Sequence, residues 1–322
     1  MKLQIPEPLR LREEAICTAL RGAAETGGDT GEAAGLLEAI LLPHLEKERM
    51  DVLQPLGLLS LLARGEVSSE MLEVLPQIDQ LKNDLHGLQV EHATILSAIK
   101  RFVAAARAEG KTQHARFAER LLFRAWLDES VFTPLVILIG KYLRRRLTGE
   151  DDTAAATQLV SSELVELRIP ESLQLSHAQL NAALLEAMQA GGQTMIAAEV
   201  LAQLLEPHLH KEDREVLRIL GLLAPLAANR IDLAAAEDVS EWDELEKSER
   251  FLHDEHTALI AAAEKLRTIA GAEDAHEVLD FAERLLLRIR LVEEVFYPAA
   301  LLIRNYVRLR SRNRLAKEAY IQ

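Results

Sequence analysis

The residues in this chain that could do chemistry are histidines and glutamates that stand four positions apart. His44 and Glu48 form one such pair, and His208 and Glu212 form a second. On an α-helix, side chains four residues apart lie on the same face, one turn from each other. Apolar residues continue that face, so both pairs are expected to point into a core. A buried imidazole beside a buried carboxylate is unfavourable unless a metal ion or a polar network satisfies both groups.

The two pairs belong to an internal repeat with an offset of 164 residues, which also aligns His92 with His256. The alignment runs along the chain without gaps, and a repeat of this length indicates two copies of one fold. The apolar periodicity breaks in a segment rich in Gly, Asp, Thr and Ser between the copies. We therefore expect a first domain at 1–148, a linker at 149–163 and a second domain at 164–322.

Each copy has the sequence pattern of four helices joined by short connections. Apolar residues recur every three to four positions without period-two alternation, and Ala, Leu, Glu and Arg dominate the composition. Short connections make neighbouring helices antiparallel. We expect an all-α protein of two tandem up-down four-helix bundles, related by internal duplication. The expected helices of the first copy are 7–25, 32–64, 70–108 (with a break near Pro76) and 112–147 (with a kink at Pro134).

Counting by threes and fours from the core leucines predicts which titratable side chains face each core. Every expected helix contributes at least one. They are Glu13, His44, Glu48, His92 and Glu129 in the first copy, and His177, His208, Glu212, His256 and Glu293 in the second. Imidazole nitrogen and carboxylate oxygen together suit iron, manganese or zinc, and facing helices of a bundle can bring such ligands together.

In this order along the chain, the residues resemble the hemerythrin-like (HHE) family. The family pattern is a histidine on the first helix, His-x-x-x-Glu on the second, a histidine on the third, and His-x-x-x-Glu or Asp on the fourth. The matching residues are His177, His44 with Glu48, His208 with Glu212, His92 and His256. The resemblance covers nearly the whole chain. It implies four-helix bundles with a non-haem di-iron centre that binds oxygen, peroxide or nitric oxide, or that handles iron.

Two departures from the family pattern affect the expected metal site. Glu13 stands where the first copy would have a histidine, and Arg124 and Arg288 stand where the fourth helices would have one. A guanidinium is permanently positive and cannot ligate a metal. Each site could then hold one ion, or two ions with fewer nitrogens, using Glu129 or Glu293 as the fourth-helix ligand. Alternatively, arginine could replace the cation, which would leave a metal-free scaffold or interaction protein. A metal-dependent sensor is a third possibility.

Charge and composition argue against two classes of partner. The formal net charge of −14 argues against nucleic acid, which binds clustered Lys and Arg. The longest apolar stretch, 134–140, is too short to cross a bilayer, and the N-terminus lacks the apolar run of a secretory signal. Cys17 is the only cysteine, which fits a reducing compartment. We expect a cytoplasmic protein that binds a metal ion and a small diatomic or peroxide ligand, with its two halves packed as a pseudo-dimer.

Overall fold

The computed structural model describes residues 3–149, 167–230 and 241–321. Every regular element in these ranges is helical, and they contain no β-strand. The all-helical fold expected from composition and periodicity is therefore confirmed. None of the described helices is both long enough and apolar enough to cross a membrane. The expected linker at 149–163 lies, apart from its first residue, outside the described residues.

Contacts between Cα atoms divide the chain into two compact units. Unit 1 comprises Met1–Leu58 and Val67–Asp152, and unit 2 comprises Leu59–Glu66 and Thr153–Gln322. The segment Leu59–Glu66 thus lies within the first repeat of the sequence but belongs to the second unit.

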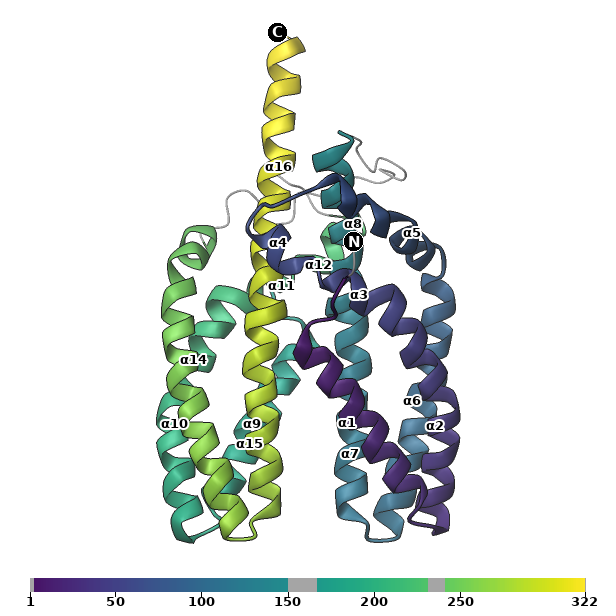
Figure 1. Cartoon of the computed structure of the whole chain (residues 1–322), viewed down its shortest axis with the longest axis vertical. Helices are drawn as coiled ribbons and strands as arrows, with labels where there is room; N and C mark the ends of the chain where they lie inside the picture. The colour runs from purple at the N-terminus through teal and green to yellow at the C-terminus, as the bar shows by residue number, and fades with distance from the viewer. Residues whose placement is uncertain (1–2, 150–166, 231–240, 322) are drawn as a thin grey trace. The chain divides into compact units, whose positions relative to one another are not determined.

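The long helices of unit 1 are α1 (Glu7–Ala24), α2 (Gly28–Glu48), α6 (Leu85–Ala108) and α7 (Thr112–Leu127). They lie side by side in Figure 1, with contacts from α1 to α2, from α2 to α6 and from α6 to α7. All of them contribute to one apolar core, in which Leu20, Leu37, Phe102 and Ala118 are fully buried. The helix α8 (Thr133–Leu147) continues the direction of α7 and packs against α3 (Gln54–Leu56), α5 (Leu75–Asn83) and the 3₁₀ helix η2 (Ser69–Val74).

Unit 2 repeats these elements at the offset of the sequence repeat. Its long helices are α9 (Glu171–Ala187), α10 (Gly192–Glu212), α14 (Glu241–Ala272), α15 (His276–Leu291) and α16 (Tyr297–Ile321). Two short helices, α11 (Arg218–Leu220) and α12 (Leu223–Ala227), follow α10. The segment from the first repeat joins this unit through α4 (Leu59–Ala63), which packs against α16. The side-chain amide of Asn305 donates hydrogen bonds to the carbonyl oxygens of Leu62 and Ala63, at 3.2 and 3.0 Å.

Two helices of each unit run into a π-helical turn at the level of the predicted site. In unit 1 these turns are η1 (Arg49–Leu53) after α2 and η3 (Asp128–Phe132) after α7. In unit 2 they are η4 (Asp213–Leu217) after α10 and η5 (Val292–Phe296) after α15. A π-turn closes its hydrogen bonds one residue later than an α-helix, so the face that points inward shifts across it.

This shift corrects the predicted inward line of the helix at 112–147. The regular count placed residues 122, 125 and 129 on the core side. Residues 122 and 125 are half-buried, whereas Leu121, Arg124 and Asp128, each one position earlier than the count, are buried. Glu129 is exposed, so its expected place in the core is wrong by one residue.

A glutamate that directly follows the end of another helix caps the start of α2 and of α10. Glu109 accepts hydrogen bonds from the backbone amides of Asp29 and Thr30 and from the hydroxyl of Thr30, at 2.8, 3.3 and 2.6 Å. Lys111 lies 2.8 Å from the same carboxylate. These contacts, led by the one from Lys111, lower the pKa of Glu109 to about 2. Glu273 caps α10 through the equivalent residues, Gln193 and Thr194.

Candidate metal centre

In each unit, two buried histidines from neighbouring helices face each other through their Nε2 atoms. These atoms lie 3.0 Å apart for His44 on α2 and His92 on α6, and 3.1 Å apart for His208 on α10 and His256 on α14. Two imidazole nitrogens bound to one metal ion at about 2.1 Å lie roughly 3.0 to 3.4 Å apart, for bond angles between about 90° and 110°. The spacing therefore suits one shared metal ion, but it also suits an N–H···N hydrogen bond. The protonation of the rings distinguishes the two.

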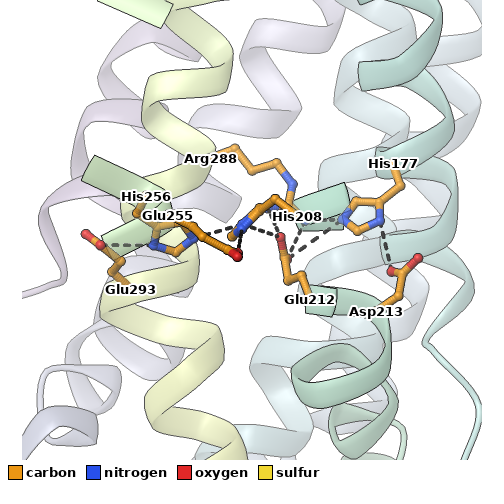
Figure 2. A network of polar contacts seen from close by, with 8 residues as sticks. All are labelled: His177, His208, Glu212, Asp213, Glu255, His256, Arg288 and Glu293. Atoms are coloured by element: carbon orange, nitrogen blue, oxygen red, sulfur yellow. Dashed lines mark hydrogen bonds and ion pairs between the residues drawn. The ribbon is translucent and has the colours of Figure 1, made fainter. Parts of the chain in front are cut away.

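Carboxylates behind the histidine pair of unit 2 fix the protonation of both rings (Figure 2). The Nδ1 of His208 lies 3.0 Å from Glu255, and the Nδ1 of His256 lies 3.0 Å from Glu293. An ionised carboxylate only accepts hydrogen bonds, so each Nδ1 must carry the proton. Each neutral ring then presents a bare Nε2 lone pair to the other ring. Two lone pairs at this distance repel each other unless a cation or an added proton lies between them.

An added proton is the less favourable of these two solutions. Burial, and then the charge of His208, hold the pKa of His256 below its ordinary value. His256 therefore resists an added proton, and the two Nε2 lone pairs form a preorganised nitrogen donor set. Neutral imidazole is the form that binds metal ions.

In unit 1 a carboxylate lies behind one ring of the histidine pair, that of His44. The Nδ1 of His44 lies 2.8 Å from Glu91, and Lys47 donates a 3.1 Å hydrogen bond to the other oxygen of the same carboxylate. Burial would raise the pKa of Glu91, but the hydrogen bonds from His44 and Lys47 outweigh it and lower that pKa. Burial lowers the pKa of His44 below its ordinary value. His44 therefore presents a bare Nε2 towards His92.

Glu48 adds a third candidate ligand in unit 1. One ligand atom each from His44, Glu48 and His92 lies within 4.8 Å of the others, and all three residues are buried. Beside them is a cavity of ≈ 20 Å³, walled on one side by aliphatic residues such as Leu41 and Ile95. A space of this size holds about one water-sized ligand.

Arg124 lies among the carboxylates of unit 1. Its Nη2 donates a 2.6 Å hydrogen bond to Glu48, and its Nε donates a 2.9 Å hydrogen bond to Asp128. Glu13 lies further away, at 3.9 Å. Three buried carboxylates thus surround one guanidinium. Burial, followed by repulsion from Asp128, raises the pKa of Glu48 to about 8 in spite of Arg124. Near pH 7 Glu48 therefore holds a proton, and a metal ion would have to displace that proton to bind its carboxylate.

Arg288 makes a different contact in unit 2 (Figure 2). Its Nη2 and Nη1 donate hydrogen bonds to the two oxygens of Glu212, at 2.7 and 3.2 Å, and Nη2 also contacts the Nε2 of His177. Burial would raise the pKa of Glu212, but the charge of Arg288 and the hydrogen bond with His177 hold that pKa well below its ordinary value. Glu212 is therefore a fully ionised partner of Arg288.

Glu13 and His177 occupy equivalent positions in the repeat and make contacts of opposite polarity. Glu13 accepts a 3.0 Å hydrogen bond from the Nε of Arg49. The Nδ1 of His177 lies 2.9 Å from an oxygen of Asp213, the residue equivalent to Arg49. The first copy has the acid at Glu13 and the base at Arg49, whereas the second copy has the base at His177 and the acid at Asp213. The exchange preserves a contact between an acid and a base at this place in each unit. Both residues are held by these partners and lie close to the arginines.

The structure brings together most, but not all, of the residues predicted for the site. The histidine pairs and Glu48 converge, Glu212 is bound by Arg288, and Glu293 contacts His256 from behind. Glu129 is exposed and lies outside the cluster. Sequence reasoning missed Glu91, Glu255 and Asp128. The recurrence of Glu-His at 91–92 and 255–256 was the available signal for the first two.

Comparison with known proteins adds no family assignment. No family model, no curated protein and no solved structure matches this chain.

Proposed function

We propose that this protein binds transition-metal ions at its histidine pairs, and that each unit is a four-helix bundle of the hemerythrin-like type. His44, His92 and Glu48 would hold an ion in unit 1, and His208 and His256 would hold one in unit 2. The supporting observation is the 3.1 Å separation of two Nε2 atoms whose rings are both protonated at Nδ1. A metal ion bound by both lone pairs removes their repulsion.

We further propose one ion per unit, in place of the di-iron centre that the resemblance implies. Arg124 and Arg288 lie among the carboxylates that a second ion would need. A fixed guanidinium repels a metal cation. Nitrogen and oxygen donors suit iron, with manganese or zinc as alternatives. Bound iron would supply oxygen, peroxide or nitric oxide binding, or would itself be the cargo of an iron-handling protein.

Elemental analysis of the untagged full chain tests this proposal. The protein would be purified, exposed to iron(II), manganese(II) or zinc(II), and freed of loose metal. We expect bound metal in the native chain, less metal in His44→Ala or His208→Ala, and no loss in the control His86→Ala, whose side chain is exposed. A His44→Ala/His208→Ala double variant with the metal content of the native chain would contradict the proposal.

The arginines support a second candidate function, a metal-free scaffold. Arg124 and Arg288 already provide a positive charge to Glu48 and Glu212. The scaffold would be preferred if the native chain bound none of the three metals and if these metals left its thermal midpoint unchanged.

A further inference from the structure

Glu48 and Glu212 occupy equivalent positions in the two units, but their arginines bind them differently. Arg288 donates two hydrogen bonds to Glu212, one to each carboxylate oxygen, at 2.7 and 3.2 Å. Arg124 donates one hydrogen bond to Glu48, at 2.6 Å. Both oxygens of Glu212 are therefore engaged by arginine, whereas Arg124 binds only one oxygen of Glu48.

The residue one helical turn after each arginine explains this difference. In unit 1 it is Asp128, which accepts a 2.9 Å hydrogen bond from the Nε of Arg124 and turns the guanidinium away from a two-point contact with Glu48. In unit 2 the equivalent residue is Val292, which is buried and cannot accept a hydrogen bond. Arg288 is then left to bind Glu212 with both terminal nitrogens.

We propose that the two units are unequal metal sites, and that unit 1 binds one divalent transition-metal ion more tightly than unit 2 because only Glu48 is able to act as a ligand. This inference rests on the proposed function. The tight site consists of His44, His92 and Glu48, whose ligand atoms lie within 4.8 Å of one another. The weak site consists of His208 and His256, with Glu212 retained by Arg288.

The two-point contact opposes ligation because each oxygen of Glu212 is held by a charge-assisted hydrogen bond, so whichever oxygen bound an ion would have to give one up. Such bonds are short and about twice as strong as neutral ones, and the planar guanidinium matches the carboxylate at two points. Glu48 has to give up at most one such bond. Asp128 remains as the partner of Arg124 when Glu48 binds an ion, so the guanidinium does not lose its only counter-ion.

Titration of the metal-free full chain with cobalt(II) tests this inference. Bound cobalt is followed by its visible absorption, and affinities are set by competition with a chelator. We expect a first equivalent that binds about 10- to 100-fold more tightly than the second, the range typical for the loss of groups that support a metal site. Glu48→Gln should remove the tight phase, and the matched variant Glu212→Gln should leave it intact.

Exchange of the residues after the arginines provides a second, independent test. Asp128→Val should weaken the first equivalent by about 10-fold or more, because Arg124 can then bind both oxygens of Glu48. Val292→Asp should strengthen the second equivalent. Helical circular dichroism of each variant verifies folding, and the conservative Glu→Gln pair decides the question if Val292→Asp does not fold.

The possible outcomes separate this inference from the proposed function. Two equivalents of equal affinity, or loss of the tight phase in Glu212→Gln instead of Glu48→Gln, would overturn the inequality of the units while leaving metal binding intact. A chain that binds no cobalt would overturn both.

Discussion

Glu91 and Glu255 lie behind the histidines and determine which ring nitrogen is free. Each carboxylate contacts an Nδ1 atom, at 2.8 and 3.0 Å, and so directs the Nε2 lone pair towards the partner ring. Carboxylates in this position fix the ring and increase the basicity of the ligand nitrogen. A side chain that is itself only partly buried thus controls a buried donor atom.

Replacing Glu91 with alanine should lower metal affinity without unfolding the protein. The expected loss at the His44–His92 pair is about 10- to 100-fold, since the imidazole loses the partner that orients it. Isothermal titration calorimetry would measure it. Glu129→Ala is the matched control, because Glu129 is an exposed glutamate of the same unit that lies outside the cluster. Equal affinities in Glu91→Ala and Glu129→Ala would show that the carboxylate behind the ring has no role.

Replacing Arg124 with methionine should reduce stability more than the loss of a surface ion pair. Glu48 and Asp128 would remain buried without their common partner, which typically lowers the free energy of unfolding by about 3–5 kcal/mol. Denaturant unfolding monitored by circular dichroism measures this change.

Arg10→Met provides the comparison for Arg124→Met. Arg10 pairs with Glu14 at the surface, where such a pair contributes about 0–1 kcal/mol. If both variants lost less than about 1 kcal/mol, Arg124 would not be the counter-ion of the buried carboxylates.

Sequence patterns identified the histidines but not the acids that support them. His-x-x-x-Glu places both side chains on one helical face, so His44 with Glu48 and His208 with Glu212 could be found by spacing alone. Glu91 and Glu255 stand next to inward histidines and fall off the inward line of their helices, so periodicity assigns them to the surface. Their role depends on the neighbouring helix, α2 or α10, which carries the histidine that each glutamate contacts.

At the scale of the helices, the π-turns explain the main error in register. Periodicity predicted one helix at 112–147 with a kink at Pro134, and the structure is helical throughout this range, with a π-turn at Asp128–Phe132. A single extra residue in one turn moves Asp128 into the core and Glu129 out of it. A single π-turn leaves no repeating apolar pattern in the sequence, so periodicity cannot predict where it occurs.

Proline is a partial signal for these π-turns. Pro55, Pro134 and Pro298 follow η1, η3 and η5, and proline disturbs the hydrogen bonds of the preceding turn. The turn η4 is followed at the equivalent position by Ile219, so the wider turn also forms without proline.

The glutamate cap of α2 should make stability depend on pH in the acid range. The pKa of Glu109 falls from 4.5 to about 2 on folding, so the ionised cap stabilises the native state above about pH 4.5. This stabilisation decreases as the pH falls towards 2, because the native state then takes up the proton as well.

Glu109→Gln should therefore have a lower thermal midpoint than the native chain at pH 7, and the difference should shrink between pH 4.5 and pH 2. Glu32→Gln, at an exposed position of the same helix, should show no such trend. A difference between Glu109→Gln and the native chain that stays constant with pH would exclude an ionised cap.

At the scale of the whole chain, the repeat is the feature that sequence predicts best. The helices α10 and α15 and the π-turns η4 and η5 begin and end at the offset of the sequence repeat from their counterparts. The grouping of Leu59–Glu66 with unit 2 could not be predicted, because a short helix shows no sequence sign of which surface it covers. The exchange of Asp128 for Val292 is visible in the alignment of the copies, but its effect on arginine appears only in the side-chain contacts.

Anomalous diffraction from crystals of the full chain grown with iron(II), measured at the iron absorption edge, tests metal binding most directly. We expect a peak between the Nε2 atoms of His44 and His92, about 2.1 Å from each nitrogen. Two Nε2 atoms that remain 3.0 Å apart with no peak between them, in crystals grown with iron in excess, would contradict metal binding and identify the pair as a hydrogen bond.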